Sequence, residues 1–377
     1  MSTRPRKTTP NSSRHLSNST AAAEPRLSAS LLLVNAKNEV LVIQRTKESS
    51  SFPGMHAFPG GNYDQLHDGA LPPEDAMPIT AIREAFEETG ILLAYPQHSG
   101  SPAPNPVELS TARKAIHSRS DPYTFPDFLK QYHLSAENVK RKLIPFSQWI
   151  TPANAKARFW TWFYVVFLDE LEGNVYTCNE LQETPLEKDL NTGSQEAVTK
   201  RGVEEAKRIP VSITPSHDGQ IEVVSTYFQH PKALLDSFGR KEISLMPPQF
   251  YLLTMFSDIL NIASTTGKNE GTGTTLSQRF RELVAPGFGC RSFNPRFGGK
   301  IKCSDGIIRS SLMYEGDQDY EKQVNAAVLD SNDLDPSQRR WHRSLVTFQD
   351  SRIATIRLER DIDVLEPGSG RQPVAKL

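Results

Sequence analysis

The sequence predicts an α/β fold, in which helices pack against a central sheet. Two β-like runs, Ala29–Val34 and Val40–Gln44, are separated by a turn-prone segment and are typical of a hairpin. Residues Ala76–Thr89 carry an apolar stripe at helical spacing, which indicates an amphipathic helix. The run Phe159–Leu168 is dense in aromatic and β-branched residues, so we expect a strand buried on both faces.

Length and composition limit the classes of protein to consider. The chain has 377 residues, of which 37% are hydrophobic, and this allows one large or two modest domains with a real core. A formal net charge of −1 gives no bulk attraction to nucleic acid. No apolar run approaches the roughly 18 residues of a membrane span. The cysteines are odd in number and lack metal-site spacing, so neither a disulfide framework nor zinc is indicated: Cys178, Cys290 and Cys303.

The N-terminal segment differs from the rest of the chain in composition. Residues 1–26 are expected to form a disordered tail, because Met1–Ala23 is rich in Ser, Thr and Asn. The same stretch holds basic residues and no acid, which could suggest a mitochondrial presequence. Pro5 and Pro10 obstruct the amphipathic helix that such a signal needs, so the tail is the favoured interpretation.

The hairpin is expected to lead through a turn rich in glycine and proline, Phe52–Asn62, into the helix Ala76–Thr89. Asp75 is the expected N-cap of this helix, and Gly90 suits a left-handed C-terminal stop. Pro78 falls in the first turn, where no intrahelical N–H bond is lost.

Three carboxylates share one face of this predicted helix. Glu84, Glu87 and Glu88 stand at i, i+3 and i+4, while Ile82 and Phe86 belong to the opposite, apolar stripe. Like charges at this spacing repel one another, and hard divalent cations with oxygen ligands offset such repulsion. The face therefore indicates a magnesium or manganese site, with a solvated acidic surface as the alternative.

The remaining elements follow from local pattern. Residues 95–148 are interpreted as a helical insertion with periodicity around Phe125, Phe128 and Tyr132, and 171–207 as a second, polar insertion. Beyond them we expect a domain that closes near residue 265 and an extension over 266–377. The expected elements of this region are a strand at Ile221–Val224, helices at Leu234–Phe238 and Gln249–Ile262, and a strand at Arg352–Arg360.

The carboxylate helix resembles the signature of the Nudix hydrolases, G-x5-E-x7-R-E-U-x-E-E-x-G-U, where U is a bulky apolar residue. Ala85 is a small substitute for the first U, and these residues match directly: Arg83, Glu84, Glu87, Glu88, Gly90 and Ile91. If Gly61 is the leading glycine, Gly61 to Arg83 spans 22 positions where the pattern has 14, so eight residues are inserted. Counting back eight from Arg83 places Asp75 at the early acidic position.

This resemblance implies a Nudix α/β/α sandwich with a mixed central sheet, here with a helical insertion and a β-rich C-terminal extension. It implies that Glu84, Glu87 and Glu88 hold Mg²⁺ or Mn²⁺ and that Arg83 orients a glutamate or the glycine turn. Water is delivered to a phosphorus of a substrate diphosphate. The general base stays open, and the candidates outside the helix are Asp169, Glu170, Glu204 and Glu205.

A narrower resemblance is to the peroxisomal coenzyme A diphosphatase branch of this family. The helix segment Ala81–Glu88, AIREAFEE, and the segment Pro247–Tyr251, PPQFY, are similar to that branch. An upstream pattern of coenzyme A hydrolases aligns Arg45, Gly60 and Gly61 as substrate-binding residues. Ser50 replaces its second arginine, and Lys47 is the nearest alternative cation.

The resemblance implies cleavage of coenzyme A or acyl-CoA to 3′,5′-ADP and the corresponding 4′-phosphopantetheine. The alternatives are a pyrophosphatase acting on NADH or another nucleoside-diphosphate compound, and a nucleotide-sensing Nudix module without catalysis. The chain ends in Ala375-Lys376-Leu377, which resembles a peroxisomal address read by an import receptor. We therefore expect a peroxisomal enzyme, with the mitochondrion and the cytosol as alternatives.

Overall fold

The computed structural model describes thirteen stretches of the chain, and the account below is confined to them: 23–49, 52–70, 72–100, 102–118, 123–155, 157–179, 215–216, 222–270, 274–322, 328–331, 335, 338–349 and 352–365. Most of the expected N-terminal tail, Glu204, Glu205 and the final tripeptide lie outside the described residues. The roles suggested for those segments stay predictions of the sequence.

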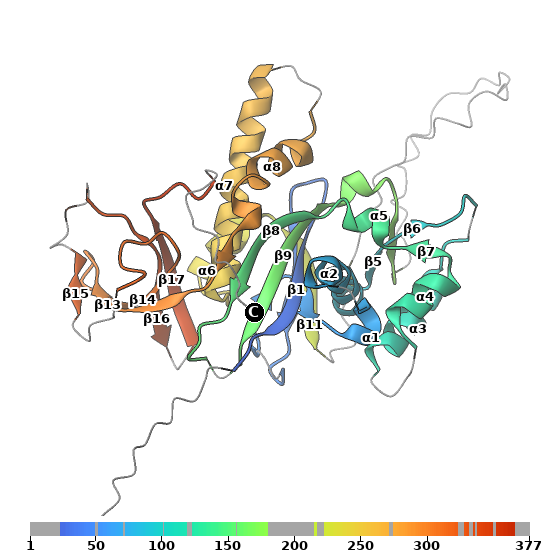
Figure 1. The fold of residues 1–377 in the computed structure, drawn as a ribbon, viewed down its shortest axis with the longest axis horizontal. Coiled ribbons are helices and arrows are strands. Elements are labelled where there is room, and N and C mark those ends of the chain that lie inside the picture. The colour runs from blue at the N-terminus through green and yellow to red at the C-terminus, as the bar shows by residue number, and fades with distance from the viewer. Residues whose placement is uncertain are drawn as a thin grey trace, which may run out of the picture.

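A mixed sheet forms the centre of the molecule (Figure 1). Its strand order is β11-β2-β1-β9-β8-β12, with β3 paired to β2 and β4 paired to β1. β1 runs parallel to β9, and β8 parallel to β12, whereas the other pairs are antiparallel. These strands are β1 Arg26–Val34, β2 Val40–Arg45, β3 His56–Ala57, β4 Gly60–Asn62, β8 Ile144–Ile150, β9 Phe159–Phe167, β11 Val223–Gln229 and β12 Ser292–Phe293.

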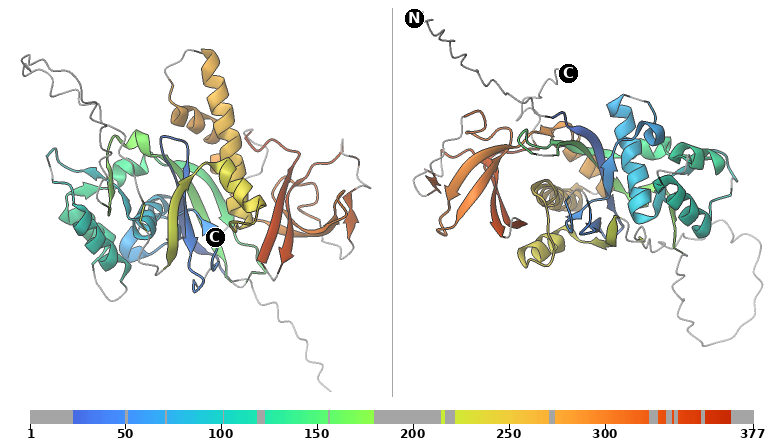
Figure 2. Two further views of the ribbon diagram at one scale, coloured as in Figure 1. Left: turned by 180° about the vertical axis from the view of Figure 1, so that it is seen from behind. Right: turned by 90° about the horizontal axis from the view of Figure 1, so that it is seen from below.

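Helices cover both faces of this sheet, as the view from below in Figure 2 shows. Alternate residues of β1 point to opposite faces, so that Leu31 and Leu33 join one core cluster and Leu32 and Val34 the other. The first cluster contains α2 Pro73–Thr89, α3 Pro106–His117, α4 Phe125–Gln131 and α5 Glu137–Lys140; the second contains α6 Pro231–Gly239, α7 Pro247–Glu270 and α8 Leu276–Val284. The predicted α/β fold with a mixed central sheet is confirmed.

Two local predictions are wrong in detail. Helix α2 begins at Pro73, its N-cap position is Pro72, and the side chain of Asp75 instead pairs with Lys140 at 2.8 Å. Strand β9 is fully buried only from Phe163 to Phe167, whereas Phe159–Trp162 are partly exposed. Gly90 ends α2 in the left-handed conformation, at φ 69°, as the sequence predicts.

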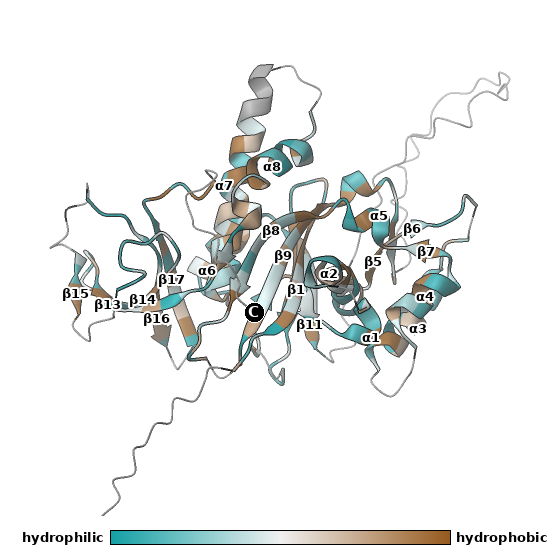
Figure 3. Cartoon of the chain, viewed as in Figure 1, coloured by the Kyte–Doolittle hydropathy of each residue, from teal (hydrophilic) through white to brown (hydrophobic). Residues whose placement is uncertain are grey.

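Several small elements accompany α2 and the helices packed around it. These are α1 Gln65–Asp68, η1 Leu168–Leu171, and the strand pairs β5 Ile91–Leu93 with β10 Val175–Thr177 and β6 Tyr95–Pro96 with β7 Leu134–Ser135. Strand β8 of the central sheet begins at Ile144, inside the range 95–148 that the sequence suggested as an insertion. Hydropathy follows this arrangement, since β5 is apolar and α1 polar (Figure 3).

A second sheet lies beside α7, on the far side of the central sheet from α4 (Figure 1). Its order is β15-β13-β14-β16-β17, formed by β13 Arg296–Lys302, β14 Ile308–Met313, β15 Leu329–Asp330, β16 His342–Gln349 and β17 Arg352–Arg360. Tyr251 of α7 connects it to the core, because its hydroxyl lies 2.7 Å from Nε2 of His342. None of the described helices is long and apolar enough to span a membrane.

Candidate active site

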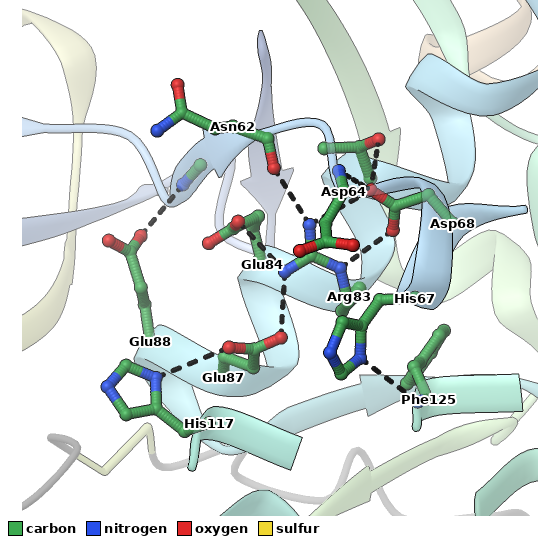
Figure 4. Close-up of polar contacts among 12 residues, drawn as sticks. Asn62, Asp64, His67, Asp68, Arg83, Glu84, Glu87, Glu88, His117 and Phe125 are labelled. Atoms are coloured by element: carbon green, nitrogen blue, oxygen red, sulfur yellow. Dashed lines mark hydrogen bonds and ion pairs between the residues drawn. The ribbon is translucent and has the colours of Figure 1, made fainter. Parts of the chain in front are cut away.

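Helix α2 presents two different sides. Ala81, Ile82, Ala85 and Phe86 are completely buried in the core. The polar side carries Arg83 and the acidic residues, and it lies under the glycine strand β4 (Figure 4). The helical period alone therefore brings the predicted side chains together: Arg83, Glu84, Glu87 and Glu88.

Arg83 is the centre of a buried ion-pair network. Its Nη1 donates to Glu84 Oε1 at 2.9 Å and to Glu87 Oε1 at 2.8 Å, while Nη2 donates to the carbonyl of Asn62 at 2.9 Å. Burial opposes the charge, but the neighbouring carboxylates raise the pKa of Arg83 above its ordinary value. The guanidinium therefore orients Glu84 and Glu87 and at the same time contacts strand β4.

The strongest partner of Arg83 is Asp68, which the sequence did not single out. Asp68 binds the guanidinium in a bidentate pair, at 2.7 and 3.0 Å, and also accepts from Thr80 at 2.9 Å. The early acidic position therefore belongs to Asp68 of α1, and its assignment to Asp75 is wrong. Counting forward from Gly61, instead of back from Arg83, comes within one residue of the correct position.

Glu88 is held from the strand side. Its Oε2 accepts the backbone N–H of Gly60 at 2.8 Å, and its Oε1 lies 3.3 Å from Arg45 Nη1. Burial raises the pKa of Glu88 well above its usual value, although Arg45 and the Gly60 N–H act in the opposite direction. Arg45 and Gly60, suggested as substrate-binding residues, thus contact a site carboxylate directly.

Glu84 lies against the second glycine of the turn. A Cβ on Gly61 would be 2.4 Å from the carboxyl carbon of Glu84, so no side chain fits there while Glu84 keeps this position. The pKa of Glu84 is raised to about 7, because burial and the charge of Glu87 together outweigh the opposite effect of Arg83. The carboxylate and the glycine strand are complementary in shape.

Glu87 has different surroundings from the other two glutamates. Besides Arg83, its carboxylate meets His117 at the end of α3, with Glu87 Oε2 3.3 Å from His117 Nδ1. Burial alone would raise the pKa of Glu87, but the hydrogen bond from His117 and the charge of Arg83 hold it below the usual value. His117 is a site residue that the sequence did not suggest.

Other residues suggested by the sequence lie elsewhere. Asp169 and Glu170 lie in η1, where Glu170 accepts from Ser277 of α8. His56, next to the glycine turn, is buried and accepts from the backbone N–H of Ser244 at 3.4 Å. Neither set joins the network around Arg83.

The donor set suits a hard divalent cation. Oxygen ligands on a rigid helix are what Mg²⁺ and Mn²⁺ prefer, and the pKa values of Glu84 and Glu88 are raised by burial that their protein partners do not offset. In the described part of the chain no three acidic, His or Cys side chains converge as drawn on one metal position. To bind a cation, Glu84 or Glu87 would have to move away from Arg83. If one of them does, the carboxylates of α2 can serve as the ligands of the ion.

Comparisons with known proteins agree with this geometry. The family model described as the NUDT19 Nudix domain matches residues 62–188, the stretch that carries the network. The chain is also 28% identical over 365 residues to the human protein named acyl-coenzyme A diphosphatase NUDT19, covering 82% of this chain and 80% of the human protein. The chain thus resembles the Nudix hydrolases over the stretch that carries the site. The predicted class of enzyme, a Nudix diphosphatase, is supported by the same matches.

A second Nudix relative is the Caenorhabditis elegans protein provisionally named nudix hydrolase 7. It is 32% identical over 159 residues, which cover 42% of this chain and half of the nematode protein's length. Among solved structures, the NUDIX hydrolase from Alicyclobacillus acidocaldarius shares 19% identity over 63% of this chain and 92% of its own, with a TM-score of 0.43. The MutT protein of Methanosarcina mazei Go1 shares 12% identity over 62% of this chain and 95% of its own, with a TM-score of 0.30.

Proposed function

We propose that this Nudix protein hydrolyses the diphosphate of coenzyme A or acyl-CoA, giving 3′,5′-ADP and the corresponding 4′-phosphopantetheine. The observation that carries the proposal is the ordered acidic face of α2 beneath β4, where Arg83 holds Glu84 and Glu87 and the Gly60 N–H holds Glu88. The choice of substrate is supported by the similarity to the human acyl-coenzyme A diphosphatase, which extends over most of both chains.

In this proposal Glu84, Glu87 and Glu88 hold Mg²⁺ or Mn²⁺. The bound ion would neutralise the substrate diphosphate and lower the pKa of attacking water. Arg83 keeps Glu84 and Glu87 in place, and the Gly60 N–H does the same for Glu88. Binding of the ion would move Glu84 or Glu87 away from Arg83, whereas the contact between Glu88 and the Gly60 N–H can stay as it is.

Arg45 is the proposed contact for a substrate phosphate. Its guanidinium lies 3.3 Å from Glu88 and 3.8 Å from Glu222, at the end of β2 nearest the acidic face. A fork of N–H donors next to bound divalent ions matches the oxygens of a diphosphate. Lys47 follows Arg45 by two residues and is the proposed partner for a further phosphate group.

A substrate panel tests the proposal. Coenzyme A, acetyl-CoA and NADH would be incubated with the protein and either Mg²⁺ or Mn²⁺, and the products identified by mass. We expect 3′,5′-ADP from the first two substrates and the highest kcat/KM for one of them. A preference for NADH of more than about tenfold would contradict the coenzyme A assignment and favour the dinucleotide alternative.

The same panel separates the enzyme from a sensing module. A module that binds nucleotides without catalysis would show saturable binding of coenzyme A but no product with any substrate or metal ion. The hydrogen-bonded carboxylates favour the enzyme, because their environment raises the pKa of half-buried Glu84 and of buried Glu88, as is common for groups at functional sites.

A further inference from the structure

Helix α3 contacts Glu87 at two points. Arg113 Nε donates to the backbone carbonyl of Glu87 at 2.7 Å, and His117 Nδ1 lies 3.3 Å from its carboxylate. Arg113 and His117 are one helical turn apart, so both side chains project from the same face of α3. One residue of α2 is thus held at its main chain and at its side chain by a single neighbouring helix.

The position of His117 is fixed by the way α3 is anchored. Asn105 caps the helix, accepting from the N–H groups of Val107 and Glu108, and Glu108 Oε2 in turn accepts from the Asn105 N–H at 2.8 Å. Arg113 is buried and also donates to Ser216 Oγ at 3.0 Å. The C-terminal turn that carries His117 therefore cannot shift without breaking buried contacts.

Two donors define the orientation of the Glu87 carboxylate. Arg83 donates to Oε1 at 2.8 Å, and His117 approaches Oε2 at 3.3 Å. An ionised carboxylate only accepts hydrogen bonds, so the contact requires the imidazole proton on Nδ1. With both oxygens directed, the carboxyl plane has one favoured rotamer, and the lone pairs that face away from Arg83 and His117 are left to bind a ligand.

We propose that His117 is a positioning residue of the active site, supplied by the helical segment after α2, and that it orients Glu87 for metal binding. The inference rests on the proposed function only in that Glu87 is taken as a metal ligand. Carboxylates that bind metals are commonly hydrogen-bonded by a second set of residues, whose loss costs about 10–100-fold in metal affinity or activity. In this role His117 needs only an N–H donor at the Nδ1 position, and it transfers no proton.

Two substitutions separate these requirements. The amide nitrogen of Asn occupies nearly the position of histidine Nδ1, so His117→Asn keeps the donor but removes the titratable ring. His117→Ala removes the donor altogether. His98→Ala is the matched control, because His98 is exposed in the loop before α3 and its ring contacts only that of His133 among the described residues.

The experiment measures Mn²⁺ affinity by electron paramagnetic resonance, and kcat and KM on whichever diphosphate the wild type hydrolyses best. We expect His117→Ala to weaken Mn²⁺ binding about 10-fold or more and to lower kcat with little change in KM, whereas His117→Asn and His98→Ala stay within about threefold of wild type. Thermal unfolding of all variants should stay close to wild type, since the His117 side chain is 25% exposed at a helix end.

Wild-type Mn²⁺ affinity and kcat in His117→Ala would overturn the proposal. A loss in His117→Asn as large as that in His117→Ala would also overturn it, because the ring and not the donor would then be required. If the proposed function is wrong, the result is different: the wild type would hydrolyse another diphosphate, or bind Mn²⁺ without turnover. The Mn²⁺ affinities of the variants could still be compared, because they do not depend on the substrate.

Discussion

Gly61 and the carboxylate of Glu84 occupy adjoining space so closely that a Cβ on residue 61 would be 2.5 Å from each carboxylate oxygen. Gly60, the preceding residue, is restricted by backbone instead, since its Cβ would be 2.4 Å from the carbonyl oxygen of Ala29. The two glycines of one turn therefore serve different purposes. Gly60 permits β4 to pair with β1, and Gly61 leaves room for a site carboxylate.

Alanine at these two positions should give opposite results. In Gly61→Ala the methyl group displaces the flexible end of Glu84, so we expect a loss of about 10-fold or more in Mn²⁺ affinity with a small change in thermal unfolding. In Gly60→Ala the backbone itself must move, which costs about 1–3 kcal/mol of unfolding free energy. Calorimetry and metal titration on both variants check this, and equal unfolding free energies in the two would contradict it.

Asp68 should matter far more for stability than Asp75. Asp68→Asn breaks a buried bidentate pair and leaves Arg83 without its closest counter-charge, which should cost about 3–5 kcal/mol of unfolding free energy. Asp75 pairs with Lys140 on a half-exposed surface, so Asp75→Asn should cost less than about 1 kcal/mol. Urea unfolding measures both values. Similar losses in the two variants would return the early acidic position to Asp75.

Glu87 and Glu88 should respond differently to neutralisation, although the sequence treats them as equivalent. Both Glu87→Gln and Glu88→Gln should abolish turnover, because each is a proposed metal ligand. Without metal at pH 8, Glu88→Gln should leave the unfolding temperature unchanged or raised, since burial already disfavours the ionised form and keeps its pKa high.

Glu87→Gln should instead lower the unfolding temperature. The pKa of Glu87 is depressed in the folded state, so its ionised form adds stability that is present above the ordinary pKa of 4.5 and is lost as the pH falls further. The substitution removes this contribution at neutral pH. Differential scanning fluorimetry of metal-free protein gives the comparison, and a higher unfolding temperature in Glu87→Gln would refute the assigned charge state.

His342 predicts a loss of stability in mild acid. This residue of β16 is completely buried, and its pKa is lowered from 6.5 to about 4: burial and the charges of Arg291 and Arg360 lower it, and the hydrogen bond to the Glu315 carbonyl opposes them. The unfolded chain therefore takes up the proton first. The contribution of neutral His342 to the unfolding free energy is fully present above pH 6.5. It decreases by roughly 3 kcal/mol as the pH falls to about 4.

Urea titrations at a series of pH values test this expectation. His342→Gln should show a shallower decline of unfolding free energy between pH 6.5 and 4 than wild type, whereas His98→Ala should follow the wild-type curve. A parallel decline in wild type and His342→Gln would show that another group is responsible.

The helices and strands that the sequence predicted well are those whose residue pattern lies entirely within the helix or strand itself. Helix α2 carries its period, its acidic face and its terminal Gly90 in adjacent residues, and the strands β1 and β2 carry theirs in the same way. Local propensity and burial agree there, so the structure follows the pattern. The burial of β9 was overestimated, because its composition does not show how far the covering helices extend.

The site residues that the sequence did not predict depend on tertiary contacts. Asp68 could not be chosen from the spacing alone, since the extra residues form the end of α1 and added N-terminal turns of α2 and leave the register ambiguous. His117 meets Glu87 across a sequence separation of 30 residues, and that contact depends on how α3 packs on α2. The spacing brings Asp68 only within one residue of the expected position, and it gives no indication of His117.

The central claim is that the acidic face of α2 holds divalent cations against a substrate diphosphate. Crystals soaked with Mn²⁺ and a nonhydrolysable coenzyme A analogue, measured for anomalous scattering from manganese, test it most directly. The account predicts anomalous peaks within about 2–2.5 Å of carboxylate oxygens of Glu84, Glu87 and Glu88, with the analogue diphosphate bound to the same ions. Manganese peaks elsewhere, with these three carboxylates still bound only to Arg83, Arg45 and Gly60, would contradict it.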